Sequence, residues 1–195
     1  MRKTILEDEG YLRQISEEVD FDDKTYLEDI DKLEEYCKNN DVFAMAGVQI
    51  GIPKRIIYLK NTTADTSKNS DKNYNEGKIL INPIVKKRRG KTRFLEGCES
   101  CSVSIEPLKY LAAVIHRPYS LEVKYYDIFG NKQSEMFKGF PTTVLSHELD
   151  HLDGILHIDL VEKSDVKVMG LQEIKLYRGE HPYEIISEDC DYEEG

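Results

Sequence analysis

His147-Glu148-Leu149-Asp150-His151 is the stretch of sequence that says most about the fold and the chemistry of this chain. On a helix, residues four positions apart lie on one face, with their Cβ atoms about 5–6 Å apart. The two imidazoles can therefore bind one divalent metal with little side-chain strain. Glu148 follows the first histidine and can reach a water activated by the metal, from which it would take a proton as general base. The pattern predicts a metallohydrolase.

The residues on either side of this pentapeptide favour a short, partly buried helix. Phe140-Pro141-Thr142-Thr143 places a proline and hydroxyl residues where a helix would begin, and Gly154 stands where it would end. Apolar residues recur at helical spacing between these points, at Val144, Leu145, Leu149 and Leu152. The plainer alternative is an exposed, charged helix that carries two unrelated imidazoles.

Length and composition predict one folded domain. The chain has 195 residues, of which 39% are hydrophobic and 33% charged, as in ordinary globular proteins. We expect residues 1–186 to form a single domain and the acidic residues 187–195 to form a flexible tail. The formal net charge of −10 argues against non-specific binding to nucleic acid, because the phosphate backbone would repel the protein.

The sequence shows no sign of secretion or of membrane insertion. No apolar run approaches the roughly 18–20 residues that span a bilayer. After Arg2 and Lys3, the chain reaches acidic residues before the apolar core of a signal peptide could form. The expected location is the cytoplasm, or an organellar matrix in a eukaryote, with no membrane association.

Hydrophobic periodicity predicts an α+β fold, with strands before the metal-binding helix. The expected elements are a helix over 22–40, strands over 54–59 and 78–83, a hairpin over 121–137 and a last helix over 164–177. Asn82-Pro83 is expected to end the second strand. The polar stretch 61–77 is expected to be a solvated loop.

Two histidines leave a catalytic metal one protein ligand short. Two histidines follow the motif, and the nearer, His157, comes sooner after His151 than the extended zincin pattern requires. Cys98 is the better candidate, because Gly97 beside it lets the backbone approach a ligand closely. A thiolate and two imidazoles would leave one position for water. His116, His157 and His181 are expected to be surface or satisfied core histidines.

Cys98 also forms a Cys-x-x-Cys pair with Cys101. Such a pair is typical of a redox dithiol or of half a zinc knuckle, but no second pair completes a structural zinc site. The serines at 100, 102 and 104 make a poor context for a thioredoxin-like motif. Four cysteines are too few for a disulfide scaffold in a chain of this length.

Three segments in chain order resemble the motifs of the peptide deformylase family. They are 42–51 (VFAMAGVQIG), 96–100 (EGCES) and 147–154 (HELDHLDG). The similarity extends over nearly the whole chain, for example to Ile81-Asn82-Pro83 before the cysteine motif. The resemblance implies the family's fold, with mixed or antiparallel strands around a central HExxH helix. It also implies a hydrolase that removes the formyl group from the N-terminal formyl-methionine of nascent polypeptides.

The resemblance further implies a ligand set and a metal. Cys98, His147 and His151 would bind one divalent ion, Fe²⁺ in the first place, with Zn²⁺, Ni²⁺ or Co²⁺ as substitutes. Glu96 and Arg117 would orient the ligands. The implied partners are formyl-methionyl peptides and nascent chains, with a transient contact to the ribosome left open. We expect a monomer with no direct binding of nucleic acid.

The family's catalytic roles fall on three further positions. Glu148 would act as base and then as proton donor to the departing amine. The side-chain amide of Gln49 and the backbone N–H of Glu99 would donate to the formyl oxygen, where preorganised donors stabilise the developing oxyanion. The pocket for the methionine side chain would be lined by Phe43, Ala44, Gly97, Phe140, Thr143 and Val144.

The chain also departs from the family pattern. The first motif has Val42, Ala44 and Val48 where the family has two glycines and a proline, and the Cβ of Ala44 would crowd the substrate peptide. Residues 105–111 belong to an insertion expected at the substrate-facing rim, where Lys109 is a weak counterpart of the family's basic residue. Two alternatives therefore stay open: a related hydrolase with another acyl substrate, or a metal- and peptide-binding homologue with little turnover.

Overall fold

The computed structural model describes residues 1–60 and 77–192, and its organising element is one long, bent strand, β3 (Gly77–Ile105). Along its length β3 pairs antiparallel with β2 (Ile56–Lys60), β5 (Ser120–Tyr126), β8 (Glu184–Asp191) and β4 (Leu108–Arg117). The sheet is extended by β1 (Ala44–Ala46) beyond β2, by β6 (Lys132–Lys138) beyond β5 and by β7 (Lys167–Gly170) beyond β4. All eight strands of the described residues therefore belong to one sheet.

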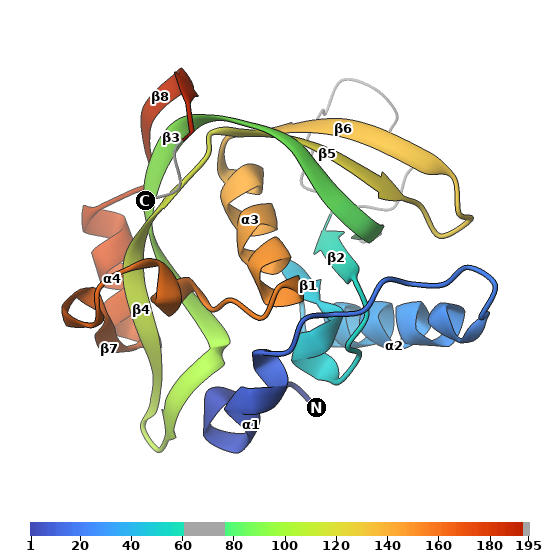
Figure 1. The fold of residues 1–195 in the computed structure, drawn as a ribbon. Helices are drawn as coiled ribbons and strands as arrows, with labels where there is room; N and C mark the ends of the chain where they lie inside the picture. Colours follow the sequence, from blue (N-terminus) through green and yellow to red (C-terminus); the bar gives the residue numbers. More distant parts are fainter. Residues whose placement is uncertain (61–76, 193–195) are drawn as a thin grey trace, which may run out of the picture.

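Helix α3 (Phe140–Leu152) lies inside the bend of this sheet, as Figure 1 shows. Its Leu145, Leu149 and Leu152 pack with Ile57 and Leu80 in one buried apolar cluster. The helix is therefore covered by sheet on several sides, which confirms the predicted α+β fold around a central HExxH helix.

Strand β2 is buried on both faces, with α3 on one side and α2 (Thr25–Asn39) on the other. Successive side chains of a strand point to opposite faces. Ile57 therefore joins the cluster around α3, while Ile56 and Tyr58 join the cluster around α2. Helix α2 meets that face with residues at helical spacing, namely Tyr26, Ile30, Leu33 and Cys37. The predicted helix over 22–40 and the strand over 54–59 are confirmed.

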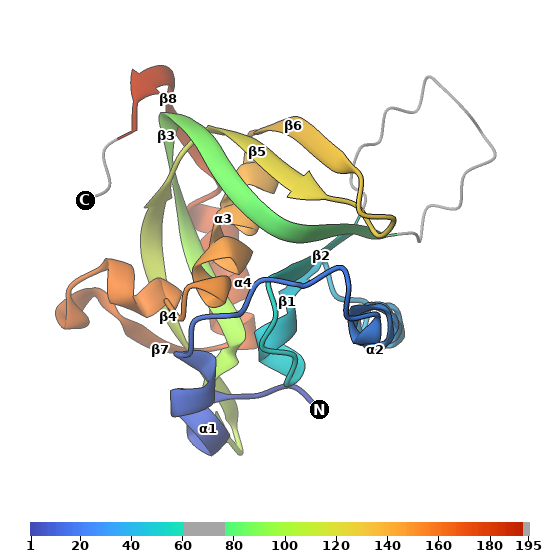
Figure 2. The same ribbon diagram turned by 45° about the vertical axis from the view of Figure 1, so that its right-hand side comes forward.

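The remaining elements are short. They are α1 (Ile5–Leu12), α4 (Leu171–Glu180) and the 3-10 helices η1 (Gly47–Ile50), η2 (His157–Leu160) and η3 (Lys163–Asp165). Figure 2 shows α1 beside the far end of the hairpin formed by β3 and β4. Helix α4 packs Ile174 against Leu95 and Ala112 of the same hairpin.

Two predicted boundaries are wrong. The strand expected to end at Asn82-Pro83 continues, because Asn82 takes a positive φ of 48° and a register shift between Ile81 and Ile84 absorbs the irregularity. The side chain of Asn82 also bonds the backbone N–H and carbonyl of Val19. The helix expected over 164–177 begins only at Leu171, because η3 and the short strand β7 occupy its first part.

Part of the acidic segment that was predicted to be a flexible tail forms a strand. Residues 187–191 lie in β8, which pairs with the segment Arg89–Arg93 of β3. Opposite charge favours this pairing, since Arg93 Nη2 lies 2.7 Å from Glu184 Oε2 and the facing segment of β3 is rich in lysine and arginine. The acidic residues taken alone do not reveal the basic strand with which they pair.

The hairpin predicted over 121–137 is confirmed as β5 and β6, which pair in register from Ser120–Lys138 to Tyr126–Lys132. The expected solvated loop over 61–77 lies outside the described residues, except for Gly77, which begins β3. Among the helices of the described residues, none has both the length and the apolar character needed to cross a membrane.

Candidate metal centre

Helix α3 presents the motif residues from one buried face. It begins after Gly139, whose φ of 70° with ψ of −144° suits glycine, and Pro141 lies in its first turn. The chain leaves the helix through Gly154 at a φ of 72°. The imidazole rings of His147 and His151 lie 4.9 Å apart between centroids. The predicted helix therefore places both imidazoles side by side.

Cys98 reaches these imidazoles from β3, at a point where the pairing with β4 is irregular. Its Sγ lies 3.4 Å from Nε2 of His151, and the ligand atoms of Cys98, His147 and His151 all lie within 4.8 Å of one another. Around a tetrahedral metal with bonds of about 2.3 Å to sulfur and 2.0–2.1 Å to nitrogen, ligand atoms would lie roughly 3.3–3.6 Å apart. The three side chains therefore fit a single divalent metal.

The surroundings of Cys98 favour the thiolate, which is the form that binds metals. A hydrogen bond with the Cys101 thiol, the charge of His151 and hydrogen bonds to both motif histidines hold the pKa of the Cys98 thiol well below its usual value. Burial acts in the opposite direction but does not prevail. The donor set is therefore a soft anion and two imidazoles, a combination that suits zinc and iron.

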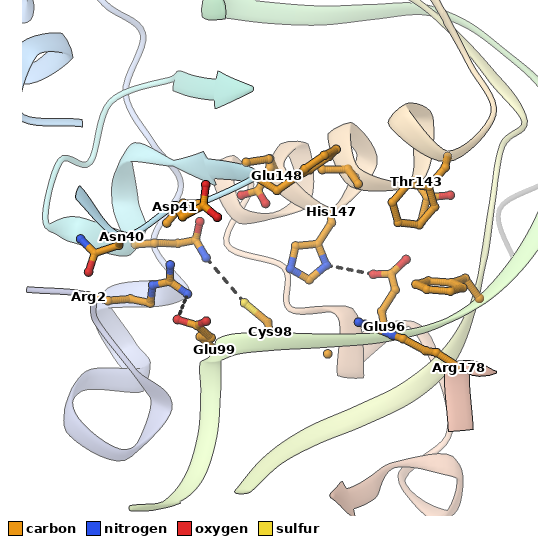
Figure 3. Close-up of a pocket in the computed structure, with 18 residues that line it drawn as sticks. Arg2, Asn40, Asp41, Glu96, Cys98, Glu99, Thr143, His147, Glu148 and Arg178 are labelled. Atoms are coloured by element: carbon orange, nitrogen blue, oxygen red, sulfur yellow. Dashed lines mark hydrogen bonds and ion pairs between the residues drawn. The ribbon is translucent and has the colours of Figure 1, made fainter. Parts of the chain in front are cut away.

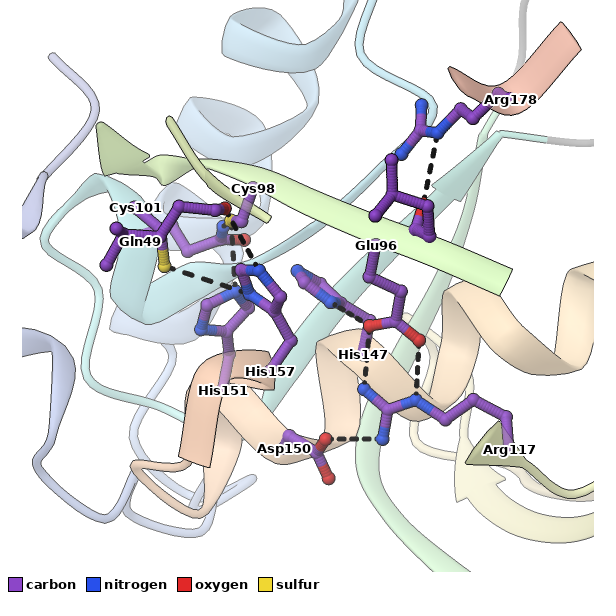
Figure 4. A network of polar contacts seen from close by, with 12 residues as sticks. Gln49, Glu96, Cys98, Cys101, Arg117, His147, Asp150, His151, His157 and Arg178 are labelled. Atoms are coloured by element: carbon purple, nitrogen blue, oxygen red, sulfur yellow. Dashed lines mark hydrogen bonds and ion pairs between the residues drawn. The ribbon is translucent and has the colours of Figure 1, made fainter. Parts of the chain in front are cut away.

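A buried chain of charged groups orients His147. Nδ1 of His147 lies 2.9 Å from Oε2 of Glu96, so Nε2 is left to face the metal position. Arg117 donates to both oxygens of Glu96, at 2.8 and 2.9 Å, and its Nη1 donates to Asp150 at 2.6 Å. Figure 4 shows the chain running from Asp150 through Arg117 and Glu96 to His147. Glu96 and Arg117 thus lie where the resemblance implied.

These contacts fix the ionisation of Glu96. Burial disfavours the carboxylate, but the charge and hydrogen bonds of Arg117, together with the hydrogen bond to His147, outweigh it and hold the pKa of Glu96 well below its usual range. Glu96 is therefore an anion that strengthens His147 as a ligand.

Glu148 faces the same cavity with its carboxylate buried. Burial raises the pKa of Glu148, while the charges of His147 and His151 and a hydrogen bond from the Ala46 backbone N–H oppose the rise. That N–H donates to Oε2 at 2.9 Å. A carboxylate with a raised pKa, held beside the ligands, has the placement and basicity that a general base needs.

Gln49 and Glu99, the two residues assigned as oxyanion donors, both lie next to Cys98. Gln49, in η1, donates its Nε2 to Cys98 Sγ at 3.6 Å and to Ser100 Oγ at 3.2 Å, while its Oε1 accepts from Ala46 N–H at 2.9 Å. Its amide is thus held with the N–H groups toward the cysteine. Glu99 lies in the irregular part of β3, with its side chain in an ion pair with Arg2 at 2.5 Å.

A cavity of about 350 Å³ opens beside these groups, as Figure 3 shows. The six residues assigned to the methionine pocket all line it: Phe43, Ala44, Gly97, Phe140, Thr143 and Val144. Phe43 and Phe140 stand 6.5 Å apart between ring centroids, and Phe94 lies edge-on to Phe140 at 5.3 Å. Cys98, Gln49, Glu148 and His147 face the same space.

The structure adds lining residues that sequence reasoning missed. Arg2, Phe94 and Arg178 belong to the wall, although none lies in a recognisable motif. Arg178 comes from α4, stands over the ring of Phe94 at 4.8 Å and donates Nε to the carbonyl of Leu95. Only tertiary packing brings these segments together, so no local signal was available.

Residues 105–111 do not lie at the cavity, contrary to the expectation for the insertion. They form the far end of the β3–β4 hairpin, and neither they nor Lys109 line the space beside the ligands. Lys109 instead pairs with Gly170 of β7. The cationic groups at the cavity are supplied by Arg2 and Arg178.

An HExxH helix whose imidazoles meet a strand cysteine beside a cavity defines a metal-dependent hydrolase. Residues 2–167 match the family described as Polypeptide deformylase. The peptide deformylase of Pelagibacter ubique is 35% identical over 84% of this chain and 87% of its own length, and that of Finegoldia magna is 32% identical over 91% and 96%. The crystal structure of a probable peptide deformylase from Synechococcus phage S-SSM7 is 32% identical, with a TM-score of 0.65 over 82% of this chain and 97% of that one. The chain belongs to the peptide deformylase family.

Proposed function

We propose that this protein hydrolyses the formamide of N-formyl-methionyl peptides, releasing formate and a free N-terminal amine. The observation that carries the proposal is that the ligand group of Cys98, His147 and His151 lies at a cavity, which Cys98, His147 and Glu148 line together with the apolar side chains of Phe43, Phe140 and Val144. Family membership supports the same reaction. We propose Fe²⁺ as the native metal and Zn²⁺ as a substitute, since a thiolate with two imidazoles accommodates both.

The protein's own groups account for most steps of this reaction. A bound divalent metal would supply Lewis acidity and a nucleophilic water at neutral pH. Glu148 accepts the proton of the attacking water and passes it to the departing amine, for which its raised pKa is suited. Gln49 Nε2 and the Glu99 N–H donate to the carbonyl oxygen as it becomes an oxyanion, each donor contributing about 2.7–4 kcal/mol to the rate.

The cavity walls provide for substrate selection. Phe43, Phe140 and Val144 offer an apolar surface for an unbranched thioether side chain, and the methyl group of Thr143 can join them. Arg2 and Arg178 provide charge that a peptide carboxylate or carbonyl would meet. The organisation as a single domain, the monomeric state and the cytoplasmic or organellar location stay predictions.

The first test is formate release from formyl-Met-Ala-Ser by Fe²⁺-loaded protein prepared without oxygen. We expect turnover in the wild type and a loss of roughly 10²–10⁴-fold in Glu148→Gln, which keeps the shape of the side chain but cannot accept the proton. Metal content and circular dichroism of the variant control for binding and folding. No formate from protein with one bound metal per chain would contradict the proposal. Turnover of acetyl-Met-Ala-Ser instead would indicate another acyl substrate.

A further inference from the structure

The proposed function gives no role to Cys101, which lies beside the metal-binding cysteine. Gly97 of β3 pairs with Ala112 of β4, and the next pair along the two strands is Ser102 with Tyr110. Two residues of β4 span about 7 Å, whereas an extended run from Gly97 to Ser102 would span about 17 Å. The segment between them must therefore loop out of the strand, which brings Cys98 and Cys101 together instead of leaving them on opposite faces.

The side chains of the two cysteines are in direct contact. Their thiols share a hydrogen bond, and both belong to one apolar cluster with Leu12 and Leu156. Neither is in a disulfide in this structure. The other two cysteines lie elsewhere: Cys37 is buried in the cluster around α2, and Cys190 is exposed on β8. Cys101 is thus the cysteine placed to react with Cys98.

The accessibility of the pair suits a small oxidant. Cys98 lines the cavity and is 7% exposed, whereas Cys101 behind it is 0% exposed. Sγ of Cys101 lies 3.8 Å from Nδ1 of His157, whose Nε2 lies 3.2 Å from the carbonyl of Leu111. A buried cysteine often serves only as a small apolar residue. Here, however, the second thiol hydrogen-bonds with the metal-binding thiol and shares its cluster, and oxidation of that metal-binding thiol would destroy the metal site.

We propose that Cys98 and Cys101 form a reversible disulfide when the protein meets a peroxide, and that this bond removes the metal-binding thiolate until a dithiol restores it. The pair would then protect Cys98 from irreversible oxidation, because a sulfenic acid that condenses with a neighbouring thiol does not proceed to sulfinic or sulfonic acid.

The chemistry balances with hydrogen peroxide as the oxidant. The Cys98 sulfur attacks one peroxide oxygen, an S–O bond forms, the O–O bond breaks, and the leaving hydroxide takes a proton to become water. The Cys101 sulfur then attacks the sulfenic sulfur, the S–S bond forms, and hydroxide leaves as a second water with the thiol proton. Two thiols are oxidised by two electrons, and the peroxide is reduced to two waters. A dithiol reverses the bond by exchange.

The test uses the full chain loaded with zinc, which has no redox chemistry of its own. After treatment with one equivalent of hydrogen peroxide, free thiols are blocked with iodoacetamide and the protein is cleaved with trypsin. Residues 94–109 form one peptide that contains Cys98 and Cys101 and no other cysteine. We expect this peptide to have lost two hydrogens and to be unalkylated, with about one zinc released per chain in a chromogenic chelator assay. Dithiothreitol should reverse the mass change, and added zinc should then rebind.

Cys101→Ala is the matched variant, because it keeps the three ligands and removes only the partner. We expect it to bind zinc normally and then, with at least three equivalents of hydrogen peroxide, given also to the wild type because each added oxygen consumes one peroxide, to gain two or three oxygens on Cys98 that dithiothreitol does not remove. A wild-type peptide with Cys98 oxygenated and Cys101 alkylated would overturn the proposal, as would a disulfide to Cys37 or Cys190. Because the readouts are peptide mass and zinc, they stand whether or not the protein releases formate.

Discussion

Arg117 is the residue on which the orientation of His147 most depends. Its guanidinium pairs with Glu96 and Asp150, and Glu96 in turn holds Nδ1 of His147. Both Glu96 and Arg117 are buried. Such a pair adds little net stability when intact, but removing one partner leaves the other charge without compensation.

We therefore expect Arg117→Met to lower the free energy of unfolding by about 3–5 kcal/mol. Arg93→Met is the matched control, because its ion pair with Glu184 is half exposed and should cost less than about 1 kcal/mol. Urea denaturation of both variants checks the difference. The double variant Glu96→Gln/Arg117→Met should recover part of the loss, since neither buried charge remains. Equal losses of unfolding free energy in Arg117→Met and Arg93→Met would argue against a buried network around Arg117.

His157 should make the stability of the fold depend on pH. Burial, followed by the nearby charge of His147, lowers the pKa of His157 to about 4, from an ordinary value of 6.5. Between these values the unfolded chain takes up a proton that the native state does not, so stability falls as the pH drops from 6.5 to 4. A shift of this size corresponds to about 3 kcal/mol.

The variant His157→Gln, which does not titrate, isolates this contribution. The difference in unfolding free energy between wild type and variant should shrink or change sign as the pH falls through that window. Urea denaturation at pH 7.5, 6, 5 and 4 measures how this difference changes with pH. We expect the total change to be about 3 kcal/mol. Parallel pH curves for the two proteins would refute the assignment.

At the scale of secondary structure, the sequence predicted the elements whose pattern is local. Helix α2 and the hairpin of β5 and β6 followed from the periodicity of their apolar residues. The errors occurred where contacts with residues distant in the chain determine which secondary structure forms. Strand β3 continues past Asn82-Pro83 because Val19 satisfies Asn82, and β8 forms because a basic strand meets it. Neither partner can be identified from the residues that are adjacent in the sequence.

The end of α3 depends on a glycine that admits no side chain. Gly154 has a φ of 72°, and a Cβ there would lie 2.3 Å from the carbonyl oxygen of Arg13. We expect Gly154→Ala to destabilise the protein by at least about 1–3 kcal/mol. Gly179→Ala in α4 is the control, because among the described residues no atom beyond the nearby backbone of its own helix lies within 4 Å of its added Cβ, and alanine favours a helix. Thermal denaturation of both variants compares them, and an equal Tm would contradict the argument.

At the scale of the whole molecule, the sequence located the site better than it located the surroundings. Cys98, His147 and His151 could be named because ligand chemistry restricts residue type and spacing, and the structure brings them together. The Ala46 N–H, which Gln49 and Glu148 share, could not be named. Nor could Arg178, which reaches the cavity from another element. A backbone N–H does not depend on the residue type, and a side chain from a distant element does not belong to a recognisable sequence motif.

The metal should stabilise the whole fold, because its ligands join α3 to β3 across 53 positions of the chain. Binding to the native state alone contributes about 2.7 kcal/mol at a metal concentration 100 times Kd. For a chain of this size, that corresponds to a rise in Tm of roughly 5–10 °C. Calorimetry before and after chelation measures it. Cys98→Ser should show almost no rise with added zinc, since a hydroxyl replaces the thiolate. A full rise in that variant would remove Cys98 from the ligand set.

The acidic strand β8 has a consequence for how copies of the protein meet. It covers part of β3 and presents Glu184, Glu188, Asp189 and Asp191 along its exposed length. An open strand edge is a template on which another molecule can pair, and rows of charge oppose such pairing. Two copies that approach through β8 repel each other near neutral pH. High ionic strength screens such exposed charges, so the protein should then lose part of its resistance to edge-to-edge aggregation.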